Sequence, residues 1–174
     1  MPKDAEESMR NPRQDESTKT QRDLYTLQEW DGFLLRFDSF NRMKRGLEEV
    51  FASSAPILIA AAMGKPCGQL ECRRIMRNAK SQDDVLKHLS ELKKKENWGE
   101  ISFHEIDYTE ALGKIRVEKA FETRDRRSDS PVCHFLRGFL AGFLSQLFEK
   151  PVAVTETRCS GKGDEYCEFM FNRQ

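Results

Sequence analysis

The sequence predicts an α+β fold in which helices pack on an antiparallel or mixed sheet. Apolar residues recur at helical spacing over residues 41–95 and again over 131–148. Two further regions, residues 100–120 and 151–172, alternate apolar and polar residues on either side of a polar turn, which is typical of β-hairpins. A chain of 174 residues is long enough for one domain with a sizeable core and too short for two.

The N-terminal residues differ in composition from the rest of the chain. Residues 1–20 carry almost no apolar side chains, so they cannot bury enough surface to offset the entropy lost on ordering. We therefore expect a disordered polar tail over residues 1–20 and a single folded domain over residues 21–174. A short docking peptide is the alternative interpretation of the tail. Residues 24–37 fit either a helix or a short strand.

The first clear helix is predicted at residues 41–51, with charged residues on one side and an apolar side made of Met43, Leu47, Val50 and Phe51. Ser53 or Ser54 can cap the next helix, which has Pro56 near its first turn. This helix is apolar all round at first, which is typical of a helix inside a core, and it extends to about residue 76. Its two glycines, Gly64 and Gly68, indicate close backbone packing, a ligand or a break.

A third helix is predicted at residues 81–95, where a basic run at 93–95 suits the negative end of the helix dipole and is interpreted as solvated. Strands at residues 100–106 and 114–120 then form a hairpin, with Gly113 in its turn. The charged residues 124–129 are expected to form a solvated loop.

The next helix is predicted at residues 131–148, with Ser130 as its cap and Pro131 at its first position. One side of this helix carries small residues, namely Gly138, Ala141, Gly142 and Ser145, where another backbone or a flat ligand can approach. Strands at about residues 151–158 and 165–172 complete the chain.

Four residues near the C-terminus can supply the ligands of a metal ion: Cys133, Glu156, Cys159 and Cys167. Three thiolates and one carboxylate suit tetrahedral zinc, and four protein ligands leave no coordination position for a substrate, so such a site braces a fold. A Gly-containing turn can bring Cys159 and Cys167 together, but the strand must bend for Cys159 to join Glu156. Paired CxxC motifs are absent, and a solvated Glu156 is the alternative.

Composition argues against several classes of function. Lys and Arg balance Asp and Glu at 29 each, which gives no reason to invoke nucleic acid or an anionic membrane. No apolar run is long enough for a membrane span, and the acidic start is unlike a secretory signal, so we expect a cytoplasmic protein. The remaining cysteines, Cys67 and Cys72, are interpreted as buried small hydrophobes.

Catalysis is not expected from these residues. The chain has no GxGxxG motif after a strand and no P-loop, and its three histidines are not paired at catalytic or zinc spacing. Cys133 and His134 are adjacent on one predicted helix, where neighbours point to different faces. We therefore predict that the protein is not an enzyme.

Three stretches of the C-terminal region resemble the 4-vinyl reductase-like domain family: PVCHFLRGFLAG at 131–142, VAVTETRC at 152–159 and GDEYCEF at 163–169. Members that resemble this chain include sensor domains of phenol-responsive activators and archaeal proteins described as hydrocarbon-binding. The resemblance implies a fold similar to that of transport-particle small subunits, an internal apolar pocket and homodimerisation. It also implies a structural zinc, held here by Cys133, Glu156, Cys159 and Cys167, that braces the C-terminal hairpin.

Three functions follow from these observations. The first is a sensor or regulatory domain that binds a hydrophobic or aromatic small molecule and signals to a regulatory protein partner. The second is a dimeric adaptor or scaffold protein of tethering-subunit-like fold. The third, suggested by the family name, is an accessory protein or enzyme of tetrapyrrole vinyl reduction.

Overall fold

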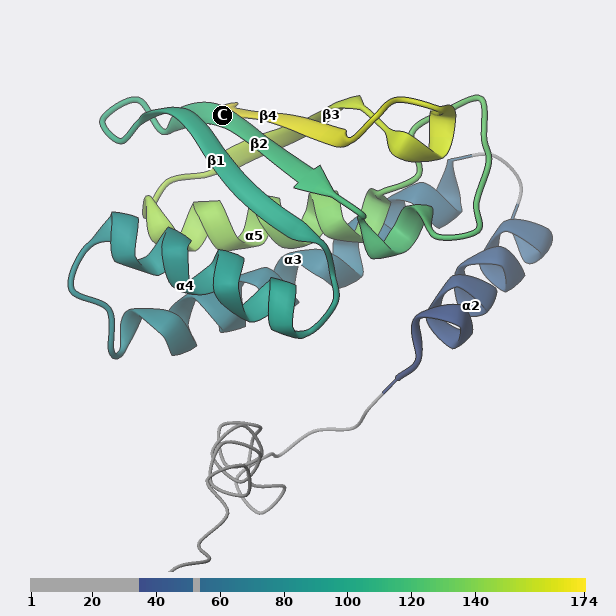
Figure 1. Cartoon of the computed structure of the whole chain (residues 1–174), viewed down its shortest axis with the longest axis horizontal. Coiled ribbons are helices and arrows are strands. Elements are labelled where there is room, and N and C mark those ends of the chain that lie inside the picture. Colours follow the sequence, from purple (N-terminus) through teal and green to yellow (C-terminus); the bar gives the residue numbers. More distant parts are fainter. Residues whose placement is uncertain (1–34, 52–53) are drawn as a thin grey trace, which may run out of the picture. The chain divides into compact units, whose positions relative to one another are not determined.

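The computed structural model describes residues 35–51 and 54–174 (Figure 1). The tail predicted at 1–20 and most of the ambiguous segment at 24–37 lie outside the described residues. The elements in chain order are α2 (Phe37–Val50), α3 (Ala55–Met76), α4 (Gln82–Lys95), β1 (Glu100–Asp107), β2 (Leu112–Glu118), the 3-10 turn η1 (Phe121–Thr123), α5 (His134–Leu147), β3 (Val152–Arg158), the 3-10 turn η2 (Ser160–Lys162) and β4 (Cys167–Arg173).

The four strands form one sheet in the order β1-β2-β4-β3, and each neighbouring pair is antiparallel. The inward side chains of the sheet, such as Ile115 and Phe169, are fully buried, and α5 lies along this face (Figure 1). The predicted α+β class is confirmed. Both hairpins lie where the alternating pattern placed them, because each strand has one buried face and one open face.

Gly113 was predicted in the turn of the first hairpin but lies inside β2. A Cβ atom at this position would come 2.7 Å from the ring of Phe171 on the neighbouring strand. The turn precedes β2 instead, and the Asp107 carboxylate accepts hydrogen bonds from the amides of Thr109 and Glu110 at 2.8 and 2.9 Å. The glycine is thus a packing requirement, since a large aromatic ring occupies the space of its side chain.

Helices α3 and α5 pack closely through glycines on both sides of their interface. A Cβ atom on Gly68 would lie 1.9 Å from the Phe139 carbonyl oxygen, and one on Gly142 would lie 1.9 Å from that of Lys65. Gly64 and Gly138 are equally close to the opposite backbone. Of the alternatives that the sequence left open for these glycines, close backbone packing is the one observed.

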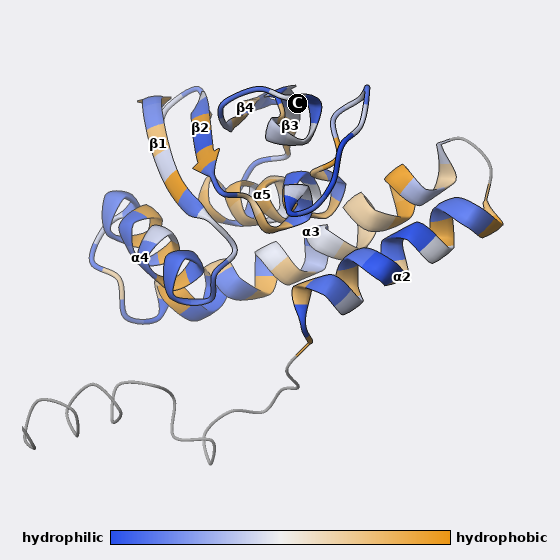
Figure 2. Ribbon diagram, turned by 45° about the vertical axis from the view of Figure 1, so that its right-hand side comes forward, coloured by the Kyte–Doolittle hydropathy of each residue, from blue (hydrophilic) through white to orange (hydrophobic). Residues whose placement is uncertain are grey.

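The prediction that the start of α3 is buried all round is wrong. The helix buries its glycine side against α5, whereas Leu58, Met63 and Leu70 are 64, 47 and 44 % exposed. The colouring in Figure 2 shows hydrophobic stretches along α3 on its solvent side.

Helix α2 begins four residues earlier than predicted, and its buried side is reversed. Val50 is 74 % exposed and Met43 is also exposed, while the polar Asn41 and Lys44 are buried. The reason is a partner distant in sequence, because Lys44 forms a buried ion pair with Glu122. An apolar pattern over eleven residues does not reveal such a partner.

Two further helix predictions need correction. Lys93, expected in the solvated end of α4, is only 2 % exposed, because its ammonium donates to Glu71 and Glu96 at 2.9 and 2.7 Å. Helix α5 begins at His134 with Cys133 as its N-cap, so Ser130 does not cap it. Cys72 is buried as predicted, whereas Cys67 is exposed.

Candidate functional site

The structure brings together all four residues that the sequence proposed as metal ligands. Cys133 is the N-cap of α5, Glu156 lies on β3, Cys159 follows β3, and Cys167 begins β4. Their ligand atoms all lie within 4.8 Å of one another. The sulfur atoms of Cys133 and Cys167 are 3.6 Å apart. Two thiolates at about 2.3 Å from a tetrahedral zinc would be roughly 3.8 Å apart, so the cluster could hold a metal ion of this kind.

The bend predicted between Glu156 and Cys159 is confirmed. Glu156 pairs with Phe169, but Arg158 pairs with Glu168, so the register shifts by one residue at this point. Such a bulge re-aims the following side chain. The Cys159 amide then donates to the Asp164 carboxylate at 2.8 Å, which fixes the backbone as it enters η2.

The carboxylate of Glu156 carries the clearest sign of an unfilled partner. Its Oε2 accepts a hydrogen bond from the Cys133 amide at 3.1 Å, whereas its Oε1 is buried without a hydrogen-bond partner among the described residues. A buried oxygen without a partner is costly, and a cation at the centre of the cluster would satisfy it. The donor set and this oxygen therefore fit a metal ion.

The electrostatics of the cluster agree with a metal site. Burial raises the pKa of the Glu156 carboxyl to about 8. The pKa of Cys133 is raised well above that of a free thiol, first because of its hydrogen bond with Cys159. The pKa of Cys159 is lowered, since its sulfur accepts hydrogen bonds from Cys133 and Cys167. Four acidic groups this close can all ionise only if a positive charge joins them.

All three cysteines of the cluster are fully buried. Ser160 adds an outer contact, with its amide and its hydroxyl each 3.4 Å from the Cys167 sulfur. Its hydroxyl also donates to Thr123 of η1 at 2.9 Å. The cluster thus joins the start of α5 to the β3–β4 hairpin, with η1 beside it.

Glu122 is a functional residue that the sequence reasoning missed. It is fully buried on η1 and accepts hydrogen bonds from the amides of Leu136 and Phe135 at 2.6 and 3.3 Å. Burial raises the pKa of Glu122, and the nearby Lys44 opposes that shift. Lys44 also donates to the Val132 carbonyl at 2.9 Å. The signal for Glu122 was indirect: the first turn of α5 leaves amides that need an acceptor, and Cys133 is a poor N-cap.

Beside Glu122 lies an aromatic cluster, by which we mean Phe37, Phe40, Trp98, Phe121, Phe135 and Phe139. Its ring centroids are 5.0 to 6.3 Å apart, in tilted and edge-to-face contacts. The buried Lys93 ammonium lies 4.3 Å from the centre of the Trp98 ring and 5.0 Å from that of Phe139. These rings fill the region between α2, α4 and α5, so the apolar pocket implied by the family resemblance is closed here.

None of the helices within residues 35–51 and 54–174 is long and apolar enough to cross a membrane.

Comparison with known families identifies the C-terminal part of the chain. Residues 114–173 match the family model of the 4-vinyl reductase domain, and this range contains all four candidate ligands. The resemblance proposed from the sequence is therefore confirmed. The uncharacterized protein MJ0150 of Methanocaldococcus jannaschii is 28 % identical over 109 residues, which are 62 % of this chain and 60 % of the relative. The chain thus spans less than two thirds of this relative.

Solved structures share the fold at low identity. The phenol-responsive sensory domain of the transcription activator PoxR, crystallised with phenol, has a TM-score of 0.75 and 19 % identity over 92 % of this chain and 89 % of that one. A vinyl-4-reductase family protein from Methanocaldococcus jannaschii has a TM-score of 0.56 and 18 % identity, covering 98 and 99 %. Subunit 3 of the trafficking protein particle complex from Naegleria fowleri, covalently bound to palmitic acid, has a TM-score of 0.62 and 11 % identity, covering 79 and 92 %. The expected similarity to transport-particle subunits is confirmed for the fold.

Proposed function

We propose that this chain, with its 4-vinyl reductase domain, is a ligand-binding sensor domain that takes a hydrophobic or aromatic small molecule into the aromatic cluster beneath α2. The observation that carries the proposal is the cluster itself, in which several rings from four elements surround a buried ammonium group. Apolar lining with a few polar groups is the usual make-up of a small-molecule site. The phenol-bound sensory domain of the same fold supports this assignment.

Helix α2 is the element that would admit the ligand. The body formed by α3, α5 and the sheet is locked by backbone contacts at the glycines. By contrast, α2 contacts this body through Phe37, Phe40 and a few polar bonds, such as the bond from Asn41 to the Phe121 carbonyl. An aromatic ligand would replace the rings of Phe37 and Phe40 against Phe121 and Phe135, so outward movement of α2 opens the site.

Lys93 would provide polar recognition in this site. Its ammonium lies over the ring of Trp98 and bonds Glu71 and Glu96. A phenolic hydroxyl or a carboxylate on the ligand would add an acceptor next to this charge. We propose binding and not catalysis, because the aromatic cluster and Lys93 offer no nucleophile beside a general base.

We infer that the metal is zinc and that its role is structural. Three thiolates with one carboxylate favour zinc over harder ions such as magnesium or calcium. Four protein ligands leave no position for a substrate. The ion would hold Cys133, two residues before the ring of Phe135, against the β3–β4 hairpin, and so it would support the floor of the aromatic site.

The tryptophan content allows a direct test. The chain has two tryptophans, so Trp30→Phe leaves Trp98 as the sole indole emitter. We expect saturable change of Trp98 fluorescence when this full-length variant is titrated with phenol or with palmitate. Phe40→Ala should alter the dissociation constant about tenfold, because it removes a ring at the site, whereas Met43→Ala on the exposed side of α2 should not.

Organic extraction of the purified native protein gives an independent measurement. Mass spectrometry should find a bound hydrophobic molecule if purification retains it. If neither probe titrates and the extract holds no stoichiometric small molecule, the sensor proposal fails.

A dimeric adaptor is the second candidate, favoured by the exposed apolar side chains of α2 and α3. Leu58, Met63 and Leu70 lie on the solvent side of α3, and contiguous exposed apolar surface commonly marks an interface. We propose that a second copy of the chain covers it. Analytical ultracentrifugation should report a dimer that Leu58→Glu dissociates, while Lys87→Glu leaves it intact. A monomer at all concentrations would exclude this candidate.

A further inference from the structure

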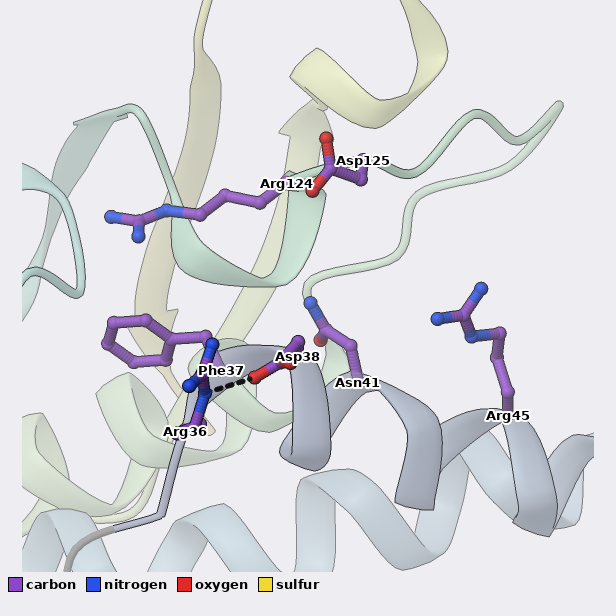
Figure 3. Close-up of a pocket in the computed structure, with 7 residues that line it drawn as sticks. All are labelled: Arg36, Phe37, Asp38, Asn41, Arg45, Arg124 and Asp125. Atoms are coloured by element: carbon purple, nitrogen blue, oxygen red, sulfur yellow. Dashed lines mark hydrogen bonds and ion pairs between the residues drawn. The ribbon is translucent and has the colours of Figure 1, made fainter.

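A polar pocket of about 440 Å³ opens at the N-terminal end of α2 (Figure 3). None of the residues that line it is a candidate metal ligand, and its lining is polar except for one ring. The lining comes from α2 and from the segment after η1, and comprises Arg36, Phe37, Asp38, Asn41, Arg45, Arg124 and Asp125.

Asn41 gives this pocket an unmet requirement. The residue is 8 % exposed, and its Nδ2 donates to the Phe121 carbonyl at 3.3 Å. That bond fixes the orientation of the amide, since a carbonyl only accepts. The Oδ1 atom is buried and has no hydrogen-bond partner among the described residues. A buried acceptor of this kind calls for an N–H or O–H donor, which a ligand in the pocket would bring.

The charged groups of the lining divide into engaged and free ones. Arg36 pairs with Asp38 at 3.2 Å, and Arg124 donates to the Asn97 carbonyl at 2.7 Å while lying over the Phe37 ring. Within residues 35–51 and 54–174, Arg45 and Asp125 form no ion pair. One free guanidinium and one free carboxylate therefore border the same space as the Asn41 amide.

The arrangement places these groups around one centre. Asn41 and Arg45 are four residues apart on α2, so they share a face of the helix. Figure 3 shows both side chains rising from α2 toward the segment that carries Asp125. A plain anion would suit Arg45 but meet the Asp125 carboxylate, and a plain cation would meet the reverse conflict.

We propose that this pocket binds a small zwitterion of the amino-acid class. Its carboxylate is held by the Arg45 guanidinium, a pairing that can be bidentate. Its protonated amine donates to Asn41 Oδ1 and to the Asp125 carboxylate. Its side chain lies toward the ring of Phe37. This site is distinct from the aromatic site proposed above, and it does not depend on that proposal.

The test uses the full-length protein and measures binding of each of the twenty L-amino acids separately by calorimetry and by amide chemical shifts. We expect at least one amino acid to bind saturably at one site per chain. Acetate and methylammonium, which each carry half of the recognised groups, should bind at least about tenfold more weakly.

Matched variants locate the site. Arg45→Gln and Asp125→Asn should each weaken binding about tenfold or more, because each removes one charge-assisted bond. Asp125 has φ of +54°, a conformation that asparagine also tolerates, so this variant keeps the backbone. The controls Arg42→Gln, on the same helix but outside the pocket lining, and Asp129→Asn should stay within about twofold.

The proposal is overturned if no amino acid binds saturably, or if acetate or methylammonium binds as tightly as the best amino acid. It is equally overturned if the two controls weaken binding as much as Arg45→Gln and Asp125→Asn do. In that case net charge, and not this pocket, governs the affinity.

Discussion

Replacing Lys44 by methionine tests the buried ion pair that ties α2 to the start of α5. The side chains of Lys44 and Glu122 are 7 and 0 % exposed, so Lys44→Met leaves the Glu122 carboxylate buried without its cation. Removing one partner of a buried pair destabilises a protein by about 3–5 kcal/mol. Glu122 keeps the amides of Leu136 and Phe135 as donors, which favours the lower end, about 3 kcal/mol at pH 7.

Protonation of Glu122 sets an upper limit and a pH dependence. A carboxyl with an unfolded pKa of about 4.3 is protonated at pH 7 at a cost of about 3.7 kcal/mol, from about 1.4 kcal/mol per pH unit. Burial already raises the folded pKa of Glu122, and loss of Lys44 raises it further. The folded state therefore binds the extra proton, so the loss of stability grows as pH rises above about 4.3 and is mostly absent below it. At pH 5 the limit is about 1 kcal/mol, plus about 1 kcal/mol for the lost bond to the Val132 carbonyl.

Urea unfolding of the metal-loaded protein measures these quantities. With a slope of about 2 kcal/mol per molar, the pH 7 midpoint of Lys44→Met should fall by roughly 1.5 M. Lys87→Met, an exposed lysine on α4, should change stability by less than about 0.5 kcal/mol. The double variant Lys44→Met/Glu122→Gln should be less destabilised than the sum of its single variants, by about 1–3 kcal/mol.

Two results would refute this reasoning. One is a midpoint for Lys44→Met within about 0.3 M of the parent at pH 7, which would mean that the pair is not desolvated. The other is a loss that does not shrink between pH 7 and pH 5, which would place its origin in packing and not in the charge of Glu122.

Three further perturbations test other parts of the structure. Gly138→Ala should destabilise the protein by about 1–3 kcal/mol in urea unfolding, because its Cβ would lie 2.0 Å from the Ala61 carbonyl oxygen; Gly46→Ala, with open space around it, should not destabilise. Cys159→Ser should lower metal content, measured by plasma mass spectrometry, at least about tenfold under chelator competition, and exposed Cys67→Ser should leave it unchanged. Lys93→Met leaves two carboxylates without their shared cation and should destabilise by about 2 kcal/mol or more at pH 7; an unchanged urea midpoint would contradict the burial of this charge.

The elements that sequence could predict are those with local causes. Strand β1 was expected at residues 100–106 and runs from Glu100 to Asp107, because its alternation depends on neighbours along the chain. The start of α4 was equally clear, since Ser81 accepts a hydrogen bond from the Asp84 amide within one turn. The four metal ligands were found for a similar reason: three of them lie within one hairpin, and the family motif supplied the fourth.

The features that sequence could not predict depend on distant partners. Lys44 and Glu122 are 78 residues apart, and nothing near either residue indicates that both are buried. Lys93 resembles its solvated neighbours in sequence and differs only because Glu71 of α3 meets it. Gly113 resembles a turn residue until the Phe171 ring on another strand is considered. In each case the burial pattern is set by tertiary contact and not by period.

The start of α5 is where the separate parts of the molecule meet. Cys133 joins it to the β3–β4 hairpin through the metal cluster, and Glu122 caps its amides while holding Lys44 of α2. If ligand binding beneath α2 requires the Lys44 pair to break, about 3 kcal/mol separates the closed from the open state. Only about one molecule in a hundred would then be open, which weakens the apparent affinity roughly hundredfold. The same cost makes α2 a sensitive reporter, because a ligand that offsets it changes the position of α2 in nearly every molecule.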